Sequence, residues 1–175
     1  LIAGRKGEEK YISVLSSITW LNQKADYMLN RVDACKTPEE SFKALLEIPL
    51  VGKFLGYEIW TDLTYFNFFG QKWTDDDFVN IGPGAKWGLE IIFEKKLNSK
   101  EQEERLRELY NIQGKYLGNP EWTKIAYKNA FSNYPLLSIT NVEGSLCEFR
   151  KYWRIKHGKG KRRYFKQALS LSSQS

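Results

Sequence analysis

Residues 45–57 of the chain read LLEIPLVGKFLGY, and this stretch decides the fold that we expect. An apolar segment ends at Ile48-Pro49-Leu50-Val51-Gly52, where proline and glycine favour a tight turn, and a second apolar segment follows. The pattern predicts two helices joined by a turn whose glycine begins the second helix. Backbone N–H groups are unpaired at the start of a helix, so they can hold a phosphate oxygen there. Val51, Gly52 and Lys53 are therefore candidates for binding a nucleic-acid backbone, although an ordinary helix–helix corner explains the same pattern.

Helix signals continue on both sides of this turn. Apolar residues recur at steps of three and four from residue 8 to residue 33, which predicts one long helix with a single apolar face. Capping residues, prolines and glycines divide the rest of the chain into further helices. We expect these at about residues 38–47, 53–69, 74–82, 85–97, 99–117, 120–131 and 140–157. No long stretch alternates between polar and apolar residues, so we expect few strands and an all-α fold.

The charge of the 175-residue chain is concentrated at its carboxyl end. The net charge is +6, no acidic residue follows Glu148, and nine of the 27 lysines and arginines lie beyond it. Such an end suits a polyanion, whose counterions are released on contact, although a solubilising tail has the same composition. We expect one helical domain at 1–157 and a basic tail at 158–175 that is disordered without a partner. The basic candidates for DNA contact are Arg150, Lys151, Arg154, Lys161, Arg162 and Arg163.

Cysteine and histidine are scarce, which limits the metal chemistry of the chain. Cys35 and Cys147 lie far apart and His157 is the single histidine, so four-cysteine zinc sites, zinc fingers with two cysteines and two histidines, and four-cysteine iron–sulfur clusters are excluded. We expect two reduced thiols, no metal and no cofactor.

The sequence carries no sign of a membrane or of secretion. No apolar run reaches the length of a membrane span, and no secretion signal opens the chain. We expect an intracellular protein without a membrane partner, in the nucleus if it is eukaryotic and in the host cytoplasm if it is viral. Because the chain begins at Leu1, we also expect it to be a piece of a longer polypeptide.

Three carboxylates occur where they would suit catalysis as well as structure. Asp77 ends a run of three aspartates, Asp62 interrupts an aromatic helix, and Glu148 directly precedes the basic run. As catalytic residues they would converge on one pocket, where they would stabilise a developing cation or orient a nucleophile. Each also has a structural explanation: the helix dipole for Asp77, exposure for Asp62 and a surface salt bridge for Glu148.

A second glycine-rich turn follows the aspartates. Gly82-Pro83-Gly84 predicts exposed backbone amides beside the start of a helix, and Lys86 follows them. We expect Gly82, Gly84 and Lys86 to contact DNA beside the first turn.

Three pieces of the sequence, in order, resemble a known family. They are Gly52-Lys53-Phe54-Leu55-Gly56-Tyr57-Glu58-Ile59 with Asp62-Leu63, then Asp77-Phe78-Val79 with Gly82-Pro83-Gly84-Ala85, then Leu146-Cys147-Glu148-Phe149 with Lys151-Tyr152. The turn at 48–52 resembles the Leu-Pro-Gly-Val-Gly turn of the helix–hairpin–helix DNA glycosylase superfamily. The whole pattern, over about residues 45–155, is similar to the α-glutamyl/putrescinyl thymine pyrophosphorylases. These are also described as the helical domain of 5-hydroxymethyluracil DNA kinases and as the amino acid:DNA transferases of thymine hypermodification.

The resemblance implies a glycosylase-like helical domain that binds double-stranded DNA and acts on 5-hydroxymethyluracil or its pyrophosphate. An amine would displace the pyrophosphate on a base turned out of the duplex, so the chain would be a base-modifying transferase. Phe54 stands where bifunctional glycosylases carry a Schiff-base lysine, and the cysteines for an iron–sulfur cluster are missing, so strand cleavage is not expected. The third residue of the turn is Leu50 where the superfamily has glycine, so we expect this turn to bind phosphate less closely. Two alternatives remain: a non-catalytic module that binds modified DNA within a larger protein, and RNA binding by the same elements.

Overall fold

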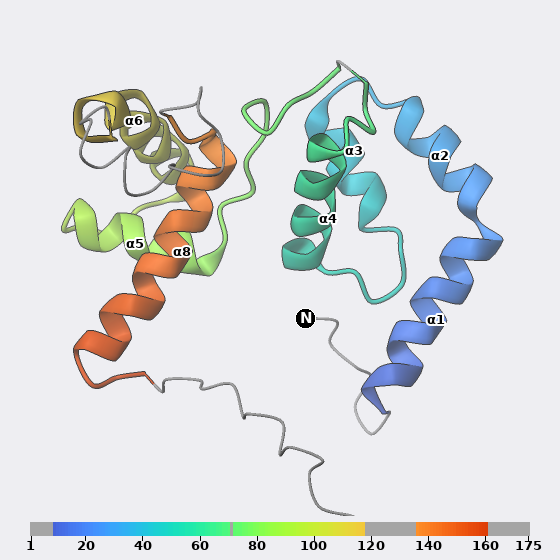
Figure 1. Ribbon diagram of the computed structural model, residues 1–175, viewed down its shortest axis with the longest axis horizontal. Coiled ribbons are helices and arrows are strands. Elements are labelled where there is room, and N and C mark those ends of the chain that lie inside the picture. The colour runs from blue at the N-terminus through green and yellow to red at the C-terminus, as the bar shows by residue number, and fades with distance from the viewer. Residues whose placement is uncertain (1–8, 71, 118–135, 161–175) are drawn as a thin grey trace, which may run out of the picture.

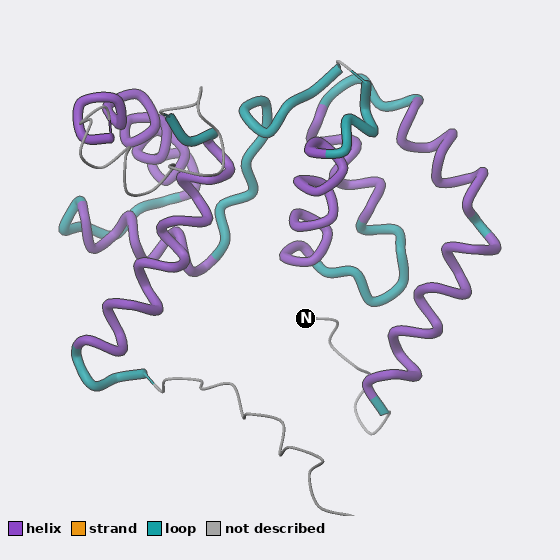
Figure 2. The backbone as a smooth tube through the Cα atoms, viewed as in Figure 1, coloured by secondary structure: helices purple, strands orange, loops and turns teal. Residues whose placement is uncertain are grey.

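The computed structural model describes residues 9–70, 72–117 and 136–160, which form helices joined by loops (Figures 1 and 2). The helices are α1 (Lys10–Gln23), α2 (Ala25–Asp33), α3 (Pro38–Leu45), α4 (Lys53–Tyr65), α5 (Pro83–Ile92), α6 (Ser99–Leu117) and α8 (Ile139–Lys156). No strand occurs in these described ranges, which confirms the all-α fold class. The turn at 48–52 between α3 and α4 is also confirmed.

Helices α2, α3 and α4 surround the first of two apolar cores (Figure 1). Helix α1 packs against this core through Trp20 and Leu21. Trp60 of α4 is fully buried, and its indole Nε1–H donates a hydrogen bond to Ser41 Oγ at 2.8 Å, so its polar atom is satisfied. Thr37 caps α3 by accepting a hydrogen bond from the Glu40 N–H, as its Thr-Pro-Glu-Glu sequence predicts. The buried apolar residues of this core are Met28, Val32, Cys35, Phe42, Ala44, Leu45, Ile48, Val51, Tyr57, Trp60 and Phe69.

Helices α5, α6 and α8 surround the second core, with α5 packed along α8 (Figure 1). Glycines permit this close approach. A Cβ at Gly84 would lie 2.6 Å from Cys147 Sγ, and one at Gly88 would lie 3.2 Å from Leu146.

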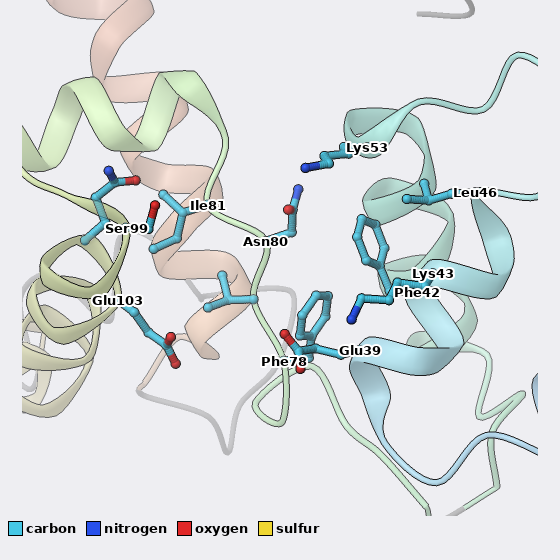
Figure 3. Close-up of a pocket in the computed structure, with 12 residues that line it drawn as sticks. Glu39, Phe42, Lys43, Leu46, Lys53, Phe78, Asn80, Ile81, Ser99 and Glu103 are labelled. Atoms are coloured by element: carbon cyan, nitrogen blue, oxygen red, sulfur yellow. The ribbon is translucent and has the colours of Figure 1, made fainter.

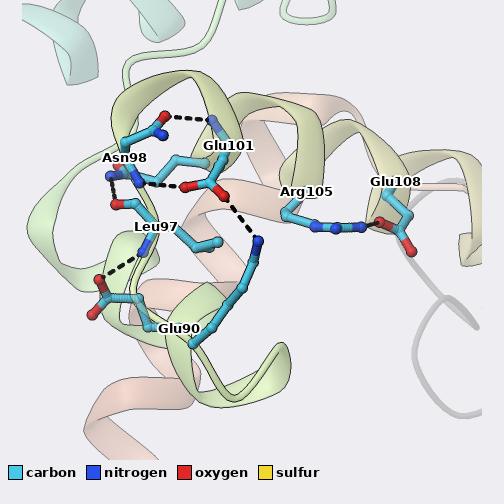
Figure 4. Close-up of polar contacts among 8 residues, drawn as sticks. Glu90, Leu97, Asn98, Glu101, Arg105 and Glu108 are labelled. Carbon is cyan, nitrogen blue, oxygen red and sulfur yellow. Dashed lines mark hydrogen bonds and ion pairs between the residues drawn. The ribbon is translucent and has the colours of Figure 1, made fainter.

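The corner between α5 and α6 is held by polar contacts (Figure 4). Asn98 and Glu101 exchange backbone and side-chain hydrogen bonds across the first turn of α6, and Lys95 pairs with Glu101 at 2.8 Å. This reciprocal arrangement fixes the start of the charged helix that the sequence predicts at 99–117.

The segment between α4 and α5 joins the two groups of helices. Val79 packs against both cores. Tyr57 of α4 and Thr140 of α8 form a buried hydrogen bond between their hydroxyl groups at 2.9 Å. The acidic turn at 75–77 also holds the start of α8, because the Asp76 carboxylate accepts the Ile139 N–H at 2.8 Å. These contacts position α8 beside the start of α4.

Several sequence predictions of local structure are wrong. The helix expected at 8–33 is two helices, because the backbone departs from helical angles at Lys24 (φ −117°, ψ 18°). The expected apolar face of its first half is exposed at Leu15 and Ile18, and the small Ser13 and Ser17 are buried instead. The serine face is buried because the Ser17 hydroxyl donates a hydrogen bond to the Pro49 carbonyl, at 2.7 Å, in the turn between α3 and α4.

The short helix expected at 74–82 is also absent. The three aspartates form a turn, and an extended segment then leads to Gly82. Here the carboxylates accept hydrogen bonds from nearby backbone and from α8, so they stabilise a turn instead of a helix start. In addition, α4 ends at Tyr65 and α5 covers 83–92, both earlier than predicted.

Two predictions fall outside the described residues: the helix at 120–131 and most of the basic tail at 158–175. Among the described helices, none combines the length and the apolar character that crossing a membrane requires.

Candidate nucleic-acid interface

The turn at 48–52 presents the start of α4 to solvent. Ile48 and Val51 are buried in the first core, and the Val51 N–H donates to the Ile48 carbonyl at 3.1 Å. Leu50 adopts a left-handed backbone (φ 66°), a conformation in which glycine carries no steric cost. Gly52 is the N-cap residue of α4, with no side-chain cap and with open space where a Cβ would stand. The first N–H groups of α4 are therefore accessible to an anion.

The start of α5 differs from that of α4 because a side chain occupies it. Gly82 is the N-cap residue and Pro83 fills the first helical position. The Gly82 N–H donates to Oε1 of Glu143, which lies on α8, at 2.9 Å. The predicted turn at 82–84 is therefore present, with one of its amides already paired.

A cleft of about 850 Å³ lies between the starts of α4 and α5 and the middle of α8. Its volume falls in the range of small-molecule sites in proteins. The residues that line it are Lys53, Phe54, Tyr57, Glu58, Asn80, Ile81, Gly82, Pro83, Gly84, Glu143, Gly144, Cys147, Glu148, Arg150, Lys151 and Arg154. Segments as far apart in the chain as Lys53 and Arg154 thus meet at one site.

Four basic side chains line this cleft, one from α4 and three from α8. Arg150 donates to the Pro83 carbonyl at 3.3 Å, which holds its guanidinium beside the start of α5. Arg154 donates to the Lys159 carbonyl at 3.1 Å, and Lys151 forms an ion pair with Glu148. Lys53 is exposed, and no ion pair involving it is present in the described part of the chain. The charges and the α4 amides together form a positive border.

A buried carboxylate also lines the cleft. Glu143 is only 7 % exposed, and burial raises the pKa of its carboxyl above the ordinary value. The hydrogen bond from the Gly82 N–H opposes this rise in pKa, while the negative charge of Glu58 adds to it. Burial and the nearby Glu143 raise the pKa of the Cys147 thiol to about 11, so this thiol is not poised as a nucleophile.

Of the three predicted catalytic carboxylates, the structure places one at the cleft. Glu148 lines it, whereas neither Asp62 nor Asp77 is among the lining residues. Asp62 is exposed on α4. Asp77 is exposed in the acidic turn, where its Oδ2 accepts hydrogen bonds from the Thr74 N–H at 2.7 Å and the Thr74 hydroxyl at 2.9 Å. The predicted convergence of all three carboxylates on one pocket is therefore not observed.

Some of the predicted DNA-binding residues line the cleft, some lie outside its lining, and others lie outside the described residues. Lys53, Gly82, Gly84, Arg150, Lys151 and Arg154 line the cleft. Gly52 directly precedes it, Val51 is buried beneath the turn, and Lys86 is exposed on α5 outside the lining. Lys161, Arg162 and Arg163 lie outside the described residues. Their roles in binding remain predictions.

Glu143 was not among the site residues predicted from the sequence. A signal for it exists, because residue 143 adjoins Val142 and precedes Leu146 by three positions, on the buried face of α8. A glutamate on an apolar helix face requires a partner, and Gly82 is that partner.

A smaller cavity of about 360 Å³ adjoins the cleft (Figure 3). Lys53, Asn80 and Ile81 line both hollows. In Figure 3, Lys53 of α4 and Asn80 extend into the space between the two groups of helices. Within the described ranges, no group of three or more histidines, cysteines, aspartates or glutamates is arranged to hold a metal ion.

Comparison with known proteins identifies related sequences. The family model described as "5-hmdU DNA kinase, helical domain" matches residues 4–162. A 5-hmdU DNA kinase of Bacillus phage SP10 is 31 % identical over 142 residues, which cover 78 % of this chain and 21 % of that protein. The chain therefore spans about a fifth of this relative. No solved structure matches.

Proposed function

This chain belongs to the family of the 5-hmdU DNA kinase helical domain, and we propose that it binds DNA and presents a modified thymine to chemistry that the longer polypeptide performs. The observation that carries the proposal is the cleft, where the uncapped start of α4 and four basic side chains surround a hollow. The family match confirms the part of the sequence resemblance that concerns these kinases. The pyrophosphorylase and glycosylase-superfamily parts of the resemblance stay predictions.

The DNA backbone would lie along the positive border of the cleft. A phosphate oxygen would accept hydrogen bonds from the first N–H groups of α4 at Gly52, with Lys53 beside it. Arg150 and Arg154 would contact neighbouring phosphates from α8. Lys161, Arg162 and Arg163 of the tail at 158–175 would extend these contacts.

Kinase chemistry would belong to another part of the polypeptide. The sequence contains no Gly-x-x-x-x-Gly-Lys-Ser/Thr motif, which in many nucleotide kinases holds the phosphates of the donor. Presentation of the base, in contrast, needs a backbone clamp and a hollow, and both are present here. A base that undergoes chemistry must leave the stack, so we propose that the modified base turns into the cleft.

A specific observation favours a second candidate, the transferase that replaces pyrophosphate by an amine on a thymine base. Glu143 and Glu148 both line the cleft, so an acid and a base are available there. Incubation with 5-hydroxymethyluracil DNA, with and without its pyrophosphorylated form and an amine, followed by nucleoside mass spectrometry, tests this candidate. An aminated thymine would support the transferase, and unchanged bases together with tight binding would support the presenting module.

Replacing Gly52 with aspartate tests the binding proposal directly. The new side chain has space, since no atom lies within 4 Å of the added Cβ, so the protein should fold. Its negative charge would stand where the phosphate should approach, so affinity for duplex DNA should fall about tenfold or more for every base.

The matched control is Gly114→Asp on α6, which adds the same charge away from the cleft with only an ordinary contact at 3.6 Å. Fluorescence anisotropy of a labelled duplex gives both affinities. Equal affinities for wild type and Gly52→Asp would exclude the α3–α4 turn from the interface.

A further inference from the structure

Glu143 has one carboxylate oxygen engaged and one available. Oε1 accepts the Gly82 N–H at 2.9 Å and lies 3.7 Å from Cys147 Sγ. Oε2 has no hydrogen-bond partner among the described residues. Glu143 lines the cleft although 93 % of the residue is buried. The cleft thus has a hydrogen-bond acceptor in its lining that Gly82 holds in place.

The charges of the cleft would attract the phosphate and the base of a nucleotide to different places. Lys53, Arg150 and Arg154 form a positive border, whereas the buried carboxylate of Glu143 makes the interior negative. A phosphate is attracted to the border and repelled from the interior. A neutral group that carries an N–H is attracted to the interior, because an ionised carboxylate accepts hydrogen bonds and donates none.

An aromatic surface adjoins this acceptor. Phe54 lines the cleft and is 62 % exposed, although a large apolar side chain gains by burial. Unpaired bases stack on such rings with little dependence on sequence. The same cleft therefore offers a stacking surface, a hydrogen-bond acceptor and a phosphate-binding border.

We propose that Glu143 is the specificity-determining residue of the cleft and that its Oε2 accepts a hydrogen bond from the imino N3–H of an extruded thymine-class base. This inference rests on the proposed DNA binding. Gly82 fixes the carboxylate through Oε1, so the direction of the second oxygen is set by the backbone of α5. The base would stack on Phe54 while its phosphates stay at the border.

The test uses the full chain and two duplexes that differ by one methyl group. Each duplex carries a single mispaired base, which is thymine in one and N3-methylthymine in the other. Methylation removes the N–H donor and weakens pairing further, so without the Glu143 contact the methylated duplex should bind equally well or more tightly. With the contact, wild type should bind it about tenfold more weakly, since a charged hydrogen bond is lost.

Variants identify the residue responsible. Glu143→Gln keeps an acceptor for the Gly82 N–H but turns an amide NH₂ toward the cleft, so the preference for thymine over N3-methylthymine should disappear. Glu58→Gln is the matched control, because it removes a charge from the same cleft at an exposed position and should retain the preference.

The outcomes separate this inference from the proposed function. Salt-dependent binding of both duplexes with no wild-type preference would overturn the role of Glu143 and leave DNA binding intact. A preference that survives in Glu143→Gln would also overturn it. Absence of any DNA binding by wild type would overturn both proposals.

Discussion

Replacing Lys53 with glutamine should reduce the salt dependence of DNA binding by an amount that follows from the cleft. Each phosphate neutralised on duplex DNA contributes about −0.9 to the slope of log K against log salt. Four cations line the cleft, so if all four contact phosphates they contribute about −3.6. Lys53 has no acidic partner among the described residues, so its full share, about 0.9, should disappear on substitution.

The effect is large enough to measure by fluorescence anisotropy. A fourfold increase in salt, from about 50 to 200 mM, weakens binding through four contacts about 150-fold and through three contacts about 40-fold. Over this range, the fold-decrease in affinity should therefore be about 3.5 times smaller for the Lys53→Gln variant than for wild type. Contacts from the tail add to both proteins equally, so the difference between them does not depend on the tail.

Lys100→Gln is the control. Lys100 lies on α6, its side chain is 87 % exposed, and it does not line the cleft. Its removal lowers the net charge by the same amount but should leave the slope unchanged. If the slope of Lys53→Gln equals that of wild type, or if both variants reduce it alike, the cleft is not where the DNA backbone lies.

Two further predictions concern stability. Gly84→Ala should destabilise the protein by about 1–3 kcal/mol, because its Cβ would lie 2.6 Å from Cys147 Sγ and 3.4 Å from the Cys147 Cα, so the Cys147 side chain must rotate or α5 and α8 must separate. Gly144→Ala in α8 is the control: no atom lies within 4 Å of the added Cβ, so this change should be neutral or stabilising by about 0.4–1 kcal/mol. Equal melting temperatures for the Gly84→Ala and Gly144→Ala variants would refute this account of the α5–α8 contact. Glu143→Gln should be at least as stable as wild type at pH 7. Burial raises the pKa of the Glu143 carboxyl in the folded state, so the stability of wild type falls as the pH rises from about 4.5 through that raised pKa, and glutamine does not ionise. The difference in melting temperature between the two proteins should close below pH 4.5, and a difference that grows toward acid pH would contradict the sign of this shift in pKa.

Local signals predicted much of the fold. Thr37-Pro38 at the start of α3, the proline and glycine of the turn at 48–52, and Gly158 after α8 act within a few residues, so the sequence alone identifies them. The break at Lys24 has no such signal. The face that α1 buries depends on the hydrogen bond from Ser17 to Pro49, 32 residues away, which no helical period reveals.

The cations and turns of the candidate site were predictable from the sequence, whereas of the predicted carboxylates Glu148 alone lines the cleft and Glu143 was not predicted. Gly52, Lys53 and the arginines of α8 stand out because their charge or backbone freedom is unusual in the local sequence. Asp62 and Asp77 stand out equally, yet a carboxylate becomes part of a site through where its helix or turn is placed. That placement depends on long-range packing, which brings Glu143 to Gly82 across 61 residues.

The acidic turn shows how a sequence feature can serve the site without lining it. Three aspartates in a row suggest either chemistry or a helix start, and the structure shows a third use. The Asp75 carbonyl accepts hydrogen bonds from the Thr140 N–H and hydroxyl, and the Asp76 carboxylate accepts from the Ile139 N–H. The turn thereby satisfies backbone donors at the start of α8, which would otherwise be unpaired. Because α8 carries Glu143 and three of the four cleft cations, Asp75 and Asp76 help to hold these side chains beside the start of α4, together with the hydrogen bond between Tyr57 and Thr140.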